Sequence, residues 1–112
     1  MAGETIDGAL VALSHSVRRD LMRLCATSER SVGELGALVR LRQPATSQHL
    51  RILRDAGLLS VRQDGNRRLY RVDFERLVRV TETLDDLWGP SLRELKRAAE
   101  ERVRDHDRPG RG

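Results

Sequence analysis

The side chains best suited to chemistry in this sequence are arginines and short polar groups, and they gather in one segment. Between Arg40 and Arg71 there are eight arginines and two acidic residues, a local formal charge of +6, whereas the whole chain of 112 residues carries +4. The remaining residues are therefore acidic on balance. Positive charge concentrated on one segment is typical of a surface that meets a polyanion such as duplex DNA.

A helix with one polar face is predicted around Pro44, because proline is tolerated in a first helical turn. Its apolar positions recur at steps of three and four residues up to about Ala56, and Gly57 then stops it. The predicted core positions are Thr46, Leu50, Leu53 and Ala56. The outer face carries Gln43, Ser47, Gln48, Arg51 and Arg54. A helix that begins with short polar side chains after a tight turn can insert its first residues into a major groove.

Three outer side chains are the predicted base readers: Gln43, Ser47 and Gln48. Glutamine can form two hydrogen bonds with adenine, and serine can either donate or accept one. The residues expected to contact the DNA backbone are Arg42, Thr46, His49, Arg51 and Arg54. The alternative for each residue taken singly is an ordinary solvated position on an amphipathic helix. His49 could equally be a partly buried histidine that packs against the hairpin that follows.

Two short strands at residues 58–63 and 67–72 are predicted to form that hairpin. Asp64, Gly65 and Asn66 join them and supply the positive φ angles of a tight turn. The residues that place positive charge on this projecting wing are Arg62, Arg67 and Arg68. They can lie against a DNA backbone or enter a narrow minor groove. The alternative is that the charged hairpin only improves solubility by blocking edge pairing.

The other predicted elements are helices. The apolar positions of the first are Ala9, Leu10 and Leu13, and those of the second, capped by Ser16, are Val17, Leu21, Leu24 and Cys25. A capping box of Ser31 and Glu34 opens a third helix that ends near Val39. Helical spacing returns from Phe74 to Ala99, with a kink or short break expected at Gly89-Pro90. Residues 1–104 are expected to form one domain, followed by a flexible tail at 105–112.

Composition excludes several classes of protein. The chain has three aromatic residues other than histidine, which disfavours base stacking on single strands. Cys25 is the only cysteine, so an internal disulfide and a zinc site of several thiolates are excluded. We interpret it as a small buried hydrophobe, with a redox-sensing thiol as the alternative.

The sequence also lacks the marks of membrane proteins and of enzymes. No apolar run reaches the length of a membrane span, and the first residues do not have the build of a signal peptide. We therefore expect a cytoplasmic protein without a membrane partner. No nucleophile, base and orienting group stand at the spacing of a catalytic set, so we expect no enzyme activity.

Several runs of residues together resemble the ArsR/SmtB family of bacterial transcriptional repressors. They are 12–21 (Ala-Leu-Ser-His-Ser-Val-Arg-Arg-Asp-Leu), 31–35 (Ser-Val-Gly-Glu-Leu), 43–50 (Gln-Pro-Ala-Thr-Ser-Gln-His-Leu), 53–58 (Leu-Arg-Asp-Ala-Gly-Leu) and 65–70 (Gly-Asn-Arg-Arg-Leu-Tyr). The resemblance implies a winged helix-turn-helix fold, mainly α with a small β-hairpin, that binds a promoter palindrome as a homodimer and blocks transcription. The three predicted base readers fall where that family contacts bases, but Arg42 stands where a capping serine is usual.

The resemblance further implies that the homodimer pairs through its first and last helices. The residues expected at that interface are Leu10, Leu13, Leu77, Leu84, Leu87, Trp88, Leu92 and Leu95. The chain length independently favours a dimer, because a single copy buries only a modest core. A small-molecule effector remains unknown at this point.

A metal site is not expected. Metal-sensing members of the family carry a cysteine pair in the helix before the turn, but residues 34–37 here are Glu-Leu-Gly-Ala. Other members place Asp and His ligands along the last helix. Here Glu82, Asp85 and Asp86 have only His106 nearby. Without thiolate or imidazole ligands at helical spacing, we expect a metal-independent member that needs no cofactor.

Two other functions are compatible with the residues. In one, the leucine face between Leu77 and Ala99 recruits a different protein, and the chain is an interaction or dimerisation module with an incidental basic surface. In the other, the chain is a DNA-binding activator or a nonspecific nucleoid protein. The operator, the regulated genes and the releasing signal cannot be read from the residues.

Overall fold

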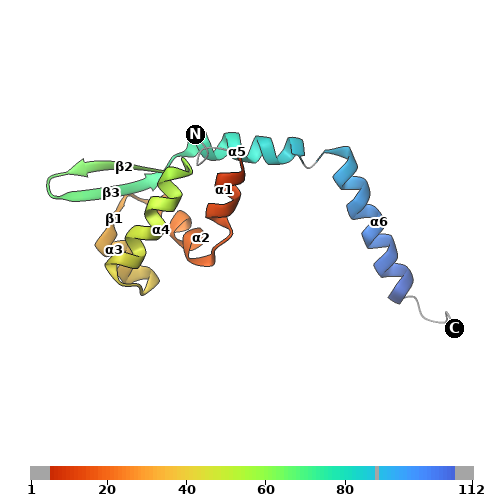
Figure 1. The fold of residues 1–112 in the computed structure, drawn as a ribbon, viewed down its shortest axis with the longest axis horizontal. Helices are drawn as coiled ribbons and strands as arrows, with labels where there is room; N and C mark the ends of the chain where they lie inside the picture. The colour runs from red at the N-terminus through yellow and green to blue at the C-terminus, as the bar shows by residue number, and fades with distance from the viewer. Residues whose placement is uncertain (1–5, 88, 108–112) are drawn as a thin grey trace. The chain divides into compact units, whose positions relative to one another are not determined.

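The computed structural model describes residues 6–87 and 89–107. In chain order the elements are α1 (Ile6–Leu13), α2 (Ser16–Thr27), β1 (Arg30–Ser31), α3 (Val32–Val39), α4 (Gln43–Asp55), β2 (Leu59–Asp64), β3 (Arg67–Val72), α5 (Phe74–Leu87) and α6 (Pro90–Asp107) (Figure 1). The chain divides into two compact units, with the boundary inside α5 between Val80 and Thr81. The mainly helical fold with a small sheet confirms the prediction of a winged helix-turn-helix.

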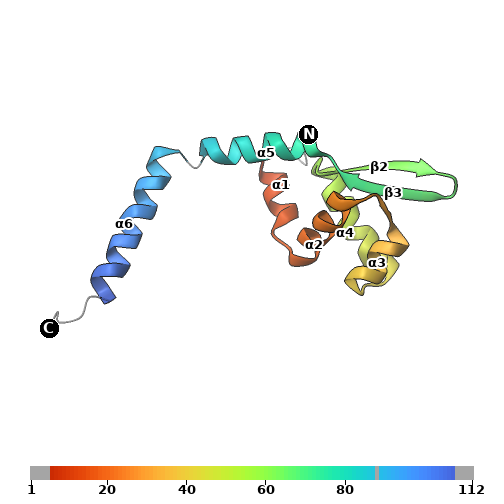
Figure 2. The same cartoon turned by 180° about the vertical axis from the view of Figure 1, so that it is seen from behind.

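The sheet has three antiparallel strands in the order β1-β3-β2. The predicted hairpin is present, with β2 one residue later than expected, and it extends away from the helices of the first unit (Figure 2). The prediction of only two strands was wrong, because β1 pairs Arg30 with Tyr70 along the other edge of β3. A strand of two residues is too short to show alternation.

The hairpin turn differs in one detail from the prediction. Asp64 pairs with Arg67, so only Gly65 and Asn66 lie between the paired positions. Gly65 has a φ of 62°, but Asn66 is not among the described residues with positive φ. Positive φ at the first central residue alone fits a type II′ turn, in which glycine is favoured at that position.

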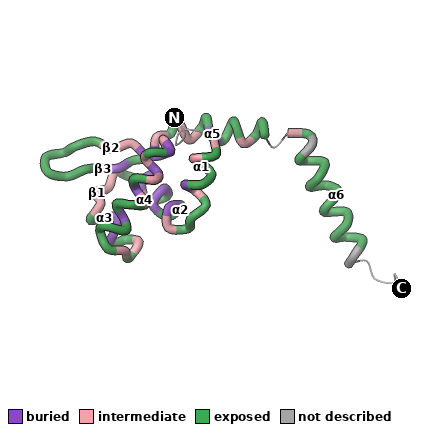
Figure 3. The backbone as a smooth tube through the Cα atoms, in the orientation of Figure 1, coloured by how far each residue is buried: buried purple, intermediate pink, exposed green. Residues whose placement is uncertain are grey.

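As the purple stretches of Figure 3 show, the buried residues of the first unit come from several elements. Among its fully buried side chains are Leu21, Leu35, Leu50, Leu53 and Leu58. Full burial of one leucine stabilises a fold by about 1.5 to 3 kcal/mol relative to leaving it in water. These contacts hold α2, α3 and α4 together and fix the base of the wing.

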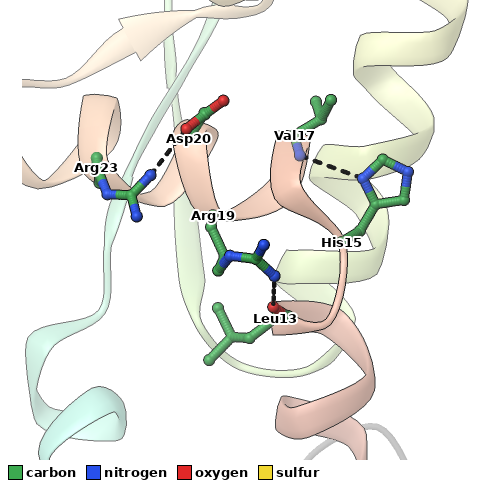
Figure 4. A network of polar contacts seen from close by, with 6 residues as sticks. All are labelled: Leu13, His15, Val17, Arg19, Asp20 and Arg23. Carbon is green, nitrogen blue, oxygen red and sulfur yellow. Dashed lines mark hydrogen bonds and ion pairs between the residues drawn. The ribbon is translucent and has the colours of Figure 1, made fainter.

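Local side-chain chemistry sets where the helices begin. Ser31 and Glu34 form the predicted capping box at the start of α3, and Pro44 lies in the first turn of α4. The predicted cap at Ser16 was wrong. His15 is the N-cap of α2, and its Nδ1 accepts a hydrogen bond from the backbone N–H of Val17 at 3.2 Å (Figure 4). Histidine is not among the residues preferred at N-caps, so the sequence does not indicate this cap.

The turn between α3 and α4 is closely packed around Gly36. A Cβ at this position would lie 3.0 Å from the carbonyl oxygen of Leu41 and 3.1 Å from Oγ1 of Thr46. Arg40 ends α3 with a φ of 59°, and its N–H donates to the carbonyl of Gly36. The chain therefore reverses in a few residues, and α4 starts close against α3.

The second unit contains the end of α5 and all of α6. Helix α5 ends at Leu87 and a separate helix begins at Pro90, so Gly89-Pro90 lies at a break, as the sequence predicts. Helix α6 continues to Asp107 and thus includes the first three residues of the segment expected to be a tail. Trp88 and residues 108–112 lie outside the described residues. Over the described residues, no helix combines the length and the apolar character needed to cross a membrane.

Candidate nucleic-acid interface

Helix α4 presents a polar face and buries an apolar one. Leu50 and Leu53 are fully buried, whereas the side chains exposed to solvent include those of Gln43, Ser47 and Gln48. Arg42 and Arg51 are also exposed, and Arg54 is half-buried, 3.9 Å from the carboxylate of Asp55. The helical face predicted from the spacing is therefore the one that α4 exposes. It carries groups that can donate to and accept from base edges.

Thr46 was predicted both as a core position of the helix and as a contact to the DNA backbone; its burial confirms the first prediction and shows that the second was wrong. Its side chain is fully buried, and its hydroxyl donates to the carbonyl oxygen of Arg42 at 3.0 Å. A phosphate cannot reach a group enclosed between α3 and α4. Thr46 instead satisfies a main-chain acceptor at the start of α4.

His49 lies on the side of α4 that packs on α2. Its ring centroid is 4.7 Å from that of His15, and its Nδ1 is 3.3 Å from Nη1 of Arg18. Partial burial lowers the pKa of His49, and the nearby His15 and Arg18 lower it further. The partly buried alternative is the one that the contacts support, although the histidine packs against α2 and not against the wing.

Arg18 is a buried arginine that the sequence analysis missed. Its Nε donates to the carbonyl of Ala12 at 2.6 Å, and its Nη2 donates to that of Val11 at 3.2 Å. Arg18, a residue of α2, thus provides hydrogen-bond donors to two carbonyl groups at the end of α1. Its third nitrogen, Nη1, lies 3.3 Å from Nδ1 of His49 on α4. Arginine is rarely buried unless it is paired. The sequence therefore does not indicate that Arg18 is buried while its neighbour Arg19 is exposed.

The wing arginines differ in how their charge is matched. Arg62 is bonded to Glu29 through two contacts of 2.8 Å, and this hydrogen bond lowers the pKa of the Glu29 carboxyl. Arg67 lies 4.0 Å from Glu34, with both side chains well exposed. Arg68 is exposed on the returning strand. The positive charge available to a ligand is therefore concentrated near the tip of the hairpin.

The start of α4 and the tip of the wing border the same hollow, which we call the wing cleft. Its volume is about 310 Å³. The lining residues are Ser31, Val32, Gly33, Gln43, Asn66, Arg67 and Arg68. Two of them are cationic and none is acidic. The predicted reading helix and the predicted wing are thus neighbours on one side of the first unit.

Cys25 has the environment of a structural residue. It is 2% exposed, and burial raises the pKa of its thiol to about 11 although Arg30 opposes the shift. The thiolate is the reactive form, so this cysteine is poorly suited to redox chemistry at neutral pH. Within the described part of the chain, no three or more His, Cys, Asp or Glu side chains are grouped so that they could hold a metal ion.

Comparison with known proteins identifies the family. Residues 15–61 match the model of the arsR family of bacterial regulatory proteins. The chain is 36% identical over 86 residues to the HTH-type transcriptional regulator Rv2034 of Mycobacterium tuberculosis, covering 77% of this chain and 80% of that protein. The chain belongs to the ArsR family. It is therefore a DNA-binding transcriptional regulator and not an enzyme.

Other similar proteins agree with this assignment. The Biofilm growth-associated repressor of Agrobacterium fabrum is 39% identical over 75 residues, covering 67% of this chain and 64% of that protein. A crystal structure of a possible transcriptional regulator for arsenical resistance superposes with a TM-score of 0.68 at 35% identity, covering 80% and 93% of the two chains. The homodimeric winged helix-turn-helix DNA-binding domain Mb0332 from Mycobacterium bovis has a TM-score of 0.61 at 26% identity, covering 72% and 78%.

The matched segment of this ArsR-family chain contains the helix-turn-helix and ends before the wing arginines. Residues 15–61 run from the His15 cap through α2, α3 and α4 into β2. The helix-turn-helix thus lies wholly inside the family match. The competing interpretation, an interaction module with an incidental basic surface, is set aside as the main function.

Proposed function

We propose that this regulator is a homodimeric repressor that binds a promoter palindrome, with α4 in the major groove and the wing on the backbone or in the minor groove. The observation that carries the proposal is the wing cleft. It places Gln43, at the start of α4, beside Arg67 and Arg68 of the wing. One face of the first unit can therefore engage base edges and phosphates together.

Within this proposal the side chains divide by what they contact. The base readers are Gln43, Ser47 and Gln48, which lie on the exposed face at the start of α4. The residues that neutralise phosphates are Arg42, Arg51, Arg54, Arg67 and Arg68. Arg62 contributes less, because Glu29 already matches its charge.

The proposed dimer uses α1 together with α5 and α6, the two helices into which the predicted last helix is divided. Large apolar side chains remain open to water there: Leu10 is 42% exposed, Leu87 58% and Leu95 66%. Leu13, Leu77 and Leu84 are half-buried, and Leu92 is 36% exposed. A second copy would cover these leucines and offset the unfavourable exposure. Two reading helices related by a twofold axis would then contact half-sites about 10 base pairs apart, or a multiple of that.

We further propose that DNA release does not depend on a transition metal. Residues 34–37 in α3 contain no thiol. In the second half of α5, Glu82, Asp85 and Asp86 are exposed carboxylates, and that helix contains no histidine. Carboxylates alone favour hard cations over zinc. Added Zn²⁺ should leave the operator affinity of the purified full chain unchanged. A metal-dependent loss of affinity would contradict this part.

The test of the main proposal is footprinting of the full chain on fragments selected from its own genome. We expect protection of one or two short palindromes and a molecular mass of two chains on the DNA. Affinity should fall steeply as salt rises, since several arginines displace counterions. Protection spread evenly over all fragments would indicate a nonspecific nucleoid protein. Binding insensitive to salt would contradict the role of the arginines.

A further inference from the structure

Gly33 lies in the first turn of α3, and neither its surroundings within the protein nor its backbone conformation requires a glycine there. A Cβ built there meets no atom of the described chain within 4 Å, and its φ is not positive. The contrast with Gly36 is sharp, because a Cβ there would lie 3.0 Å from a backbone oxygen. Glycine lowers the stability of a helix relative to alanine. A contact made with a partner outside this chain would account for a glycine at this open position.

Gly33 lies in the wall of the wing cleft. The cleft joins three segments that are distant in sequence: the start of α3, Gln43 of α4, and the hairpin tip at Asn66, Arg67 and Arg68. Two of the lining side chains are cationic, and Gly33 contributes only main-chain atoms to the cleft. A small, polar, negatively charged group therefore fits it best.

The carboxylate of Glu34 does not fill this role. It accepts a hydrogen bond from the backbone N–H of Ser31 at 3.1 Å, and this bond is the main cause of its lowered pKa. Its separation of 4.0 Å from Arg67 is at the limit of an ion pair, and both side chains are about half exposed. Such surface pairs are weak, so Arg67 can turn toward another anion at little cost.

We propose that the wing cleft seats a phosphate of the DNA backbone, and that Gly33 lacks a side chain so that the strand can come close to the main chain of α3. The inference rests on the proposed function. With α4 in a major groove and the wing at the adjacent minor groove, the strand that separates those grooves must cross between Gln43 and the hairpin tip. That path leads over the wing cleft.

The wing cleft offers a phosphate hydrogen-bond donors from two sides. Arg67 and Arg68 reach it from the hairpin, and the first amide groups of α3 have no acceptor within their own helix. The hydroxyl of Ser31 already accepts from the N–H of Glu34 at 3.2 Å. The amide of Gly33 is then the main-chain donor that we assign to the phosphate. A side chain at position 33 would stand between this amide and the strand.

The test is a size series at one position in the full chain. Gly33→Ala should weaken operator binding several-fold and Gly33→Gln about ten-fold or more, which is the scale of one lost charge-assisted hydrogen bond. Neither substitution should lower the midpoint of urea unfolding, since both residues are better helix formers than glycine. The matched control is Ala26→Gln, which adds the same side chain to an exposed position of α2 outside the cleft.

Phosphate ethylation interference provides a second readout that a general defect would not imitate. In each half-site, ethylation of one phosphate should block DNA binding by the wild type. The same ethylation should not affect binding by Gly33→Gln, because that variant has already lost its contact with this phosphate. Unchanged affinity in the series, or an unchanged ethylation pattern, would overturn the phosphate seat while leaving the repressor proposal intact. If the wild type protects no specific site, both proposals fail.

Discussion

Arg62 and Glu29 are joined by two parallel hydrogen bonds, from Nε to Oε2 and from Nη2 to Oε1, each 2.8 Å long. The pair ties β2 to the residue before β1 although 33 positions separate them. The pair lies part-way along the wing, since Arg62 is opposite Leu69, two residues before β2 ends at Asp64. The wing of this ArsR-family regulator therefore has a charge-matched middle, and Arg67 and Arg68 lie nearer its tip.

This division predicts unequal effects of two matched substitutions. Arg68→Gln should weaken DNA binding and reduce the salt slope by about 1.8, because each phosphate contact contributes about 0.9 and each subunit of the proposed dimer loses one. Arg62→Gln should change the slope little, because its charge is matched by Glu29. Fluorescence anisotropy at several salt concentrations measures both. Equal flattening by the two variants would show that Arg62 leaves Glu29 to bind DNA.

The same pair predicts a pH dependence with a definite sign. The Arg62 hydrogen bond lowers the pKa of Glu29 below its ordinary value of 4.5. Its contribution to stability is therefore complete above that value and is lost as the pH falls through the folded-state pKa. The difference in melting temperature between wild type and Glu29→Gln should be present at pH 7 and shrink below pH 4.5. A difference that persists in acid would mean that packing, not charge, stabilises the contact.

Base reading and phosphate binding should separate in a second matched pair. Gln48→Ala should reduce discrimination between operator and mutated operators by about 1 to 3 kcal/mol if its contact is bidentate. Arg67→Ala should weaken all duplexes alike. Competition binding with single-base operator variants measures the first effect and random duplex the second. If both variants bound the operator like wild type, the assignment of α4 and the wing would be wrong.

His49 should make stability depend on mild acid. Its folded-state pKa lies below the ordinary 6.5, so the unfolded chain binds the proton more readily in that range. The free energy of unfolding should therefore fall as the pH drops through 6.5. His49→Gln, whose amide oxygen can still face Arg18, should lose less stability between pH 7 and pH 5. Urea titrations at both pH values measure this, and equal losses would assign the effect to other groups.

Cys25 is predicted to be inert in the folded protein. With a thiol pKa of about 11, it should react with a thiol reagent at pH 8 only when the chain unfolds. Peroxide should leave operator affinity unchanged. Cys25→Ser should lower the free energy of unfolding by about 1 to 3 kcal/mol, because it buries a hydroxyl in an apolar site. Fast labelling of the native protein would instead support a redox-sensing thiol.

Local signals predicted most of the fold. The Ser31 and Glu34 capping box, Pro44 in a first turn and Gly65 in the hairpin act through neighbours within a few residues, so the sequence alone shows them. The spacing of Leu50 and Leu53 likewise predicted which face of α4 is exposed. These features depend on helix and turn geometry and need no tertiary information.

Other features depend on residues that are distant in sequence. Strand β1 exists only because β3 lies beside it, and the Arg62 charge is matched only because folding brings Glu29 to it. Burial of Arg18 requires the carbonyls of α1, which no spacing rule indicates. The spacing of Thr46 correctly placed it in the core, and its additional assignment to the DNA interface was wrong, because the close approach at Gly36 encloses it. The sequence could thus predict which face of the helix is exposed, but not the surroundings of each residue on it.

The close contact at Gly36 limits how this regulator can release an operator. The carbonyl of Leu41 and the hydroxyl of Thr46 lie about 3 Å from the place that a Cβ of residue 36 would take, so the two helices of the motif have no room to slide or change their crossing angle. Side chains in such contacts are close-packed and do not deform gradually. If the proposed dimer has an inducing signal, that signal would then move each DNA-reading module as a rigid body, by altering the spacing between the two subunits. Inducer sensitivity would reside in the subunit contact, where it can evolve without changing the operator sequence that is read.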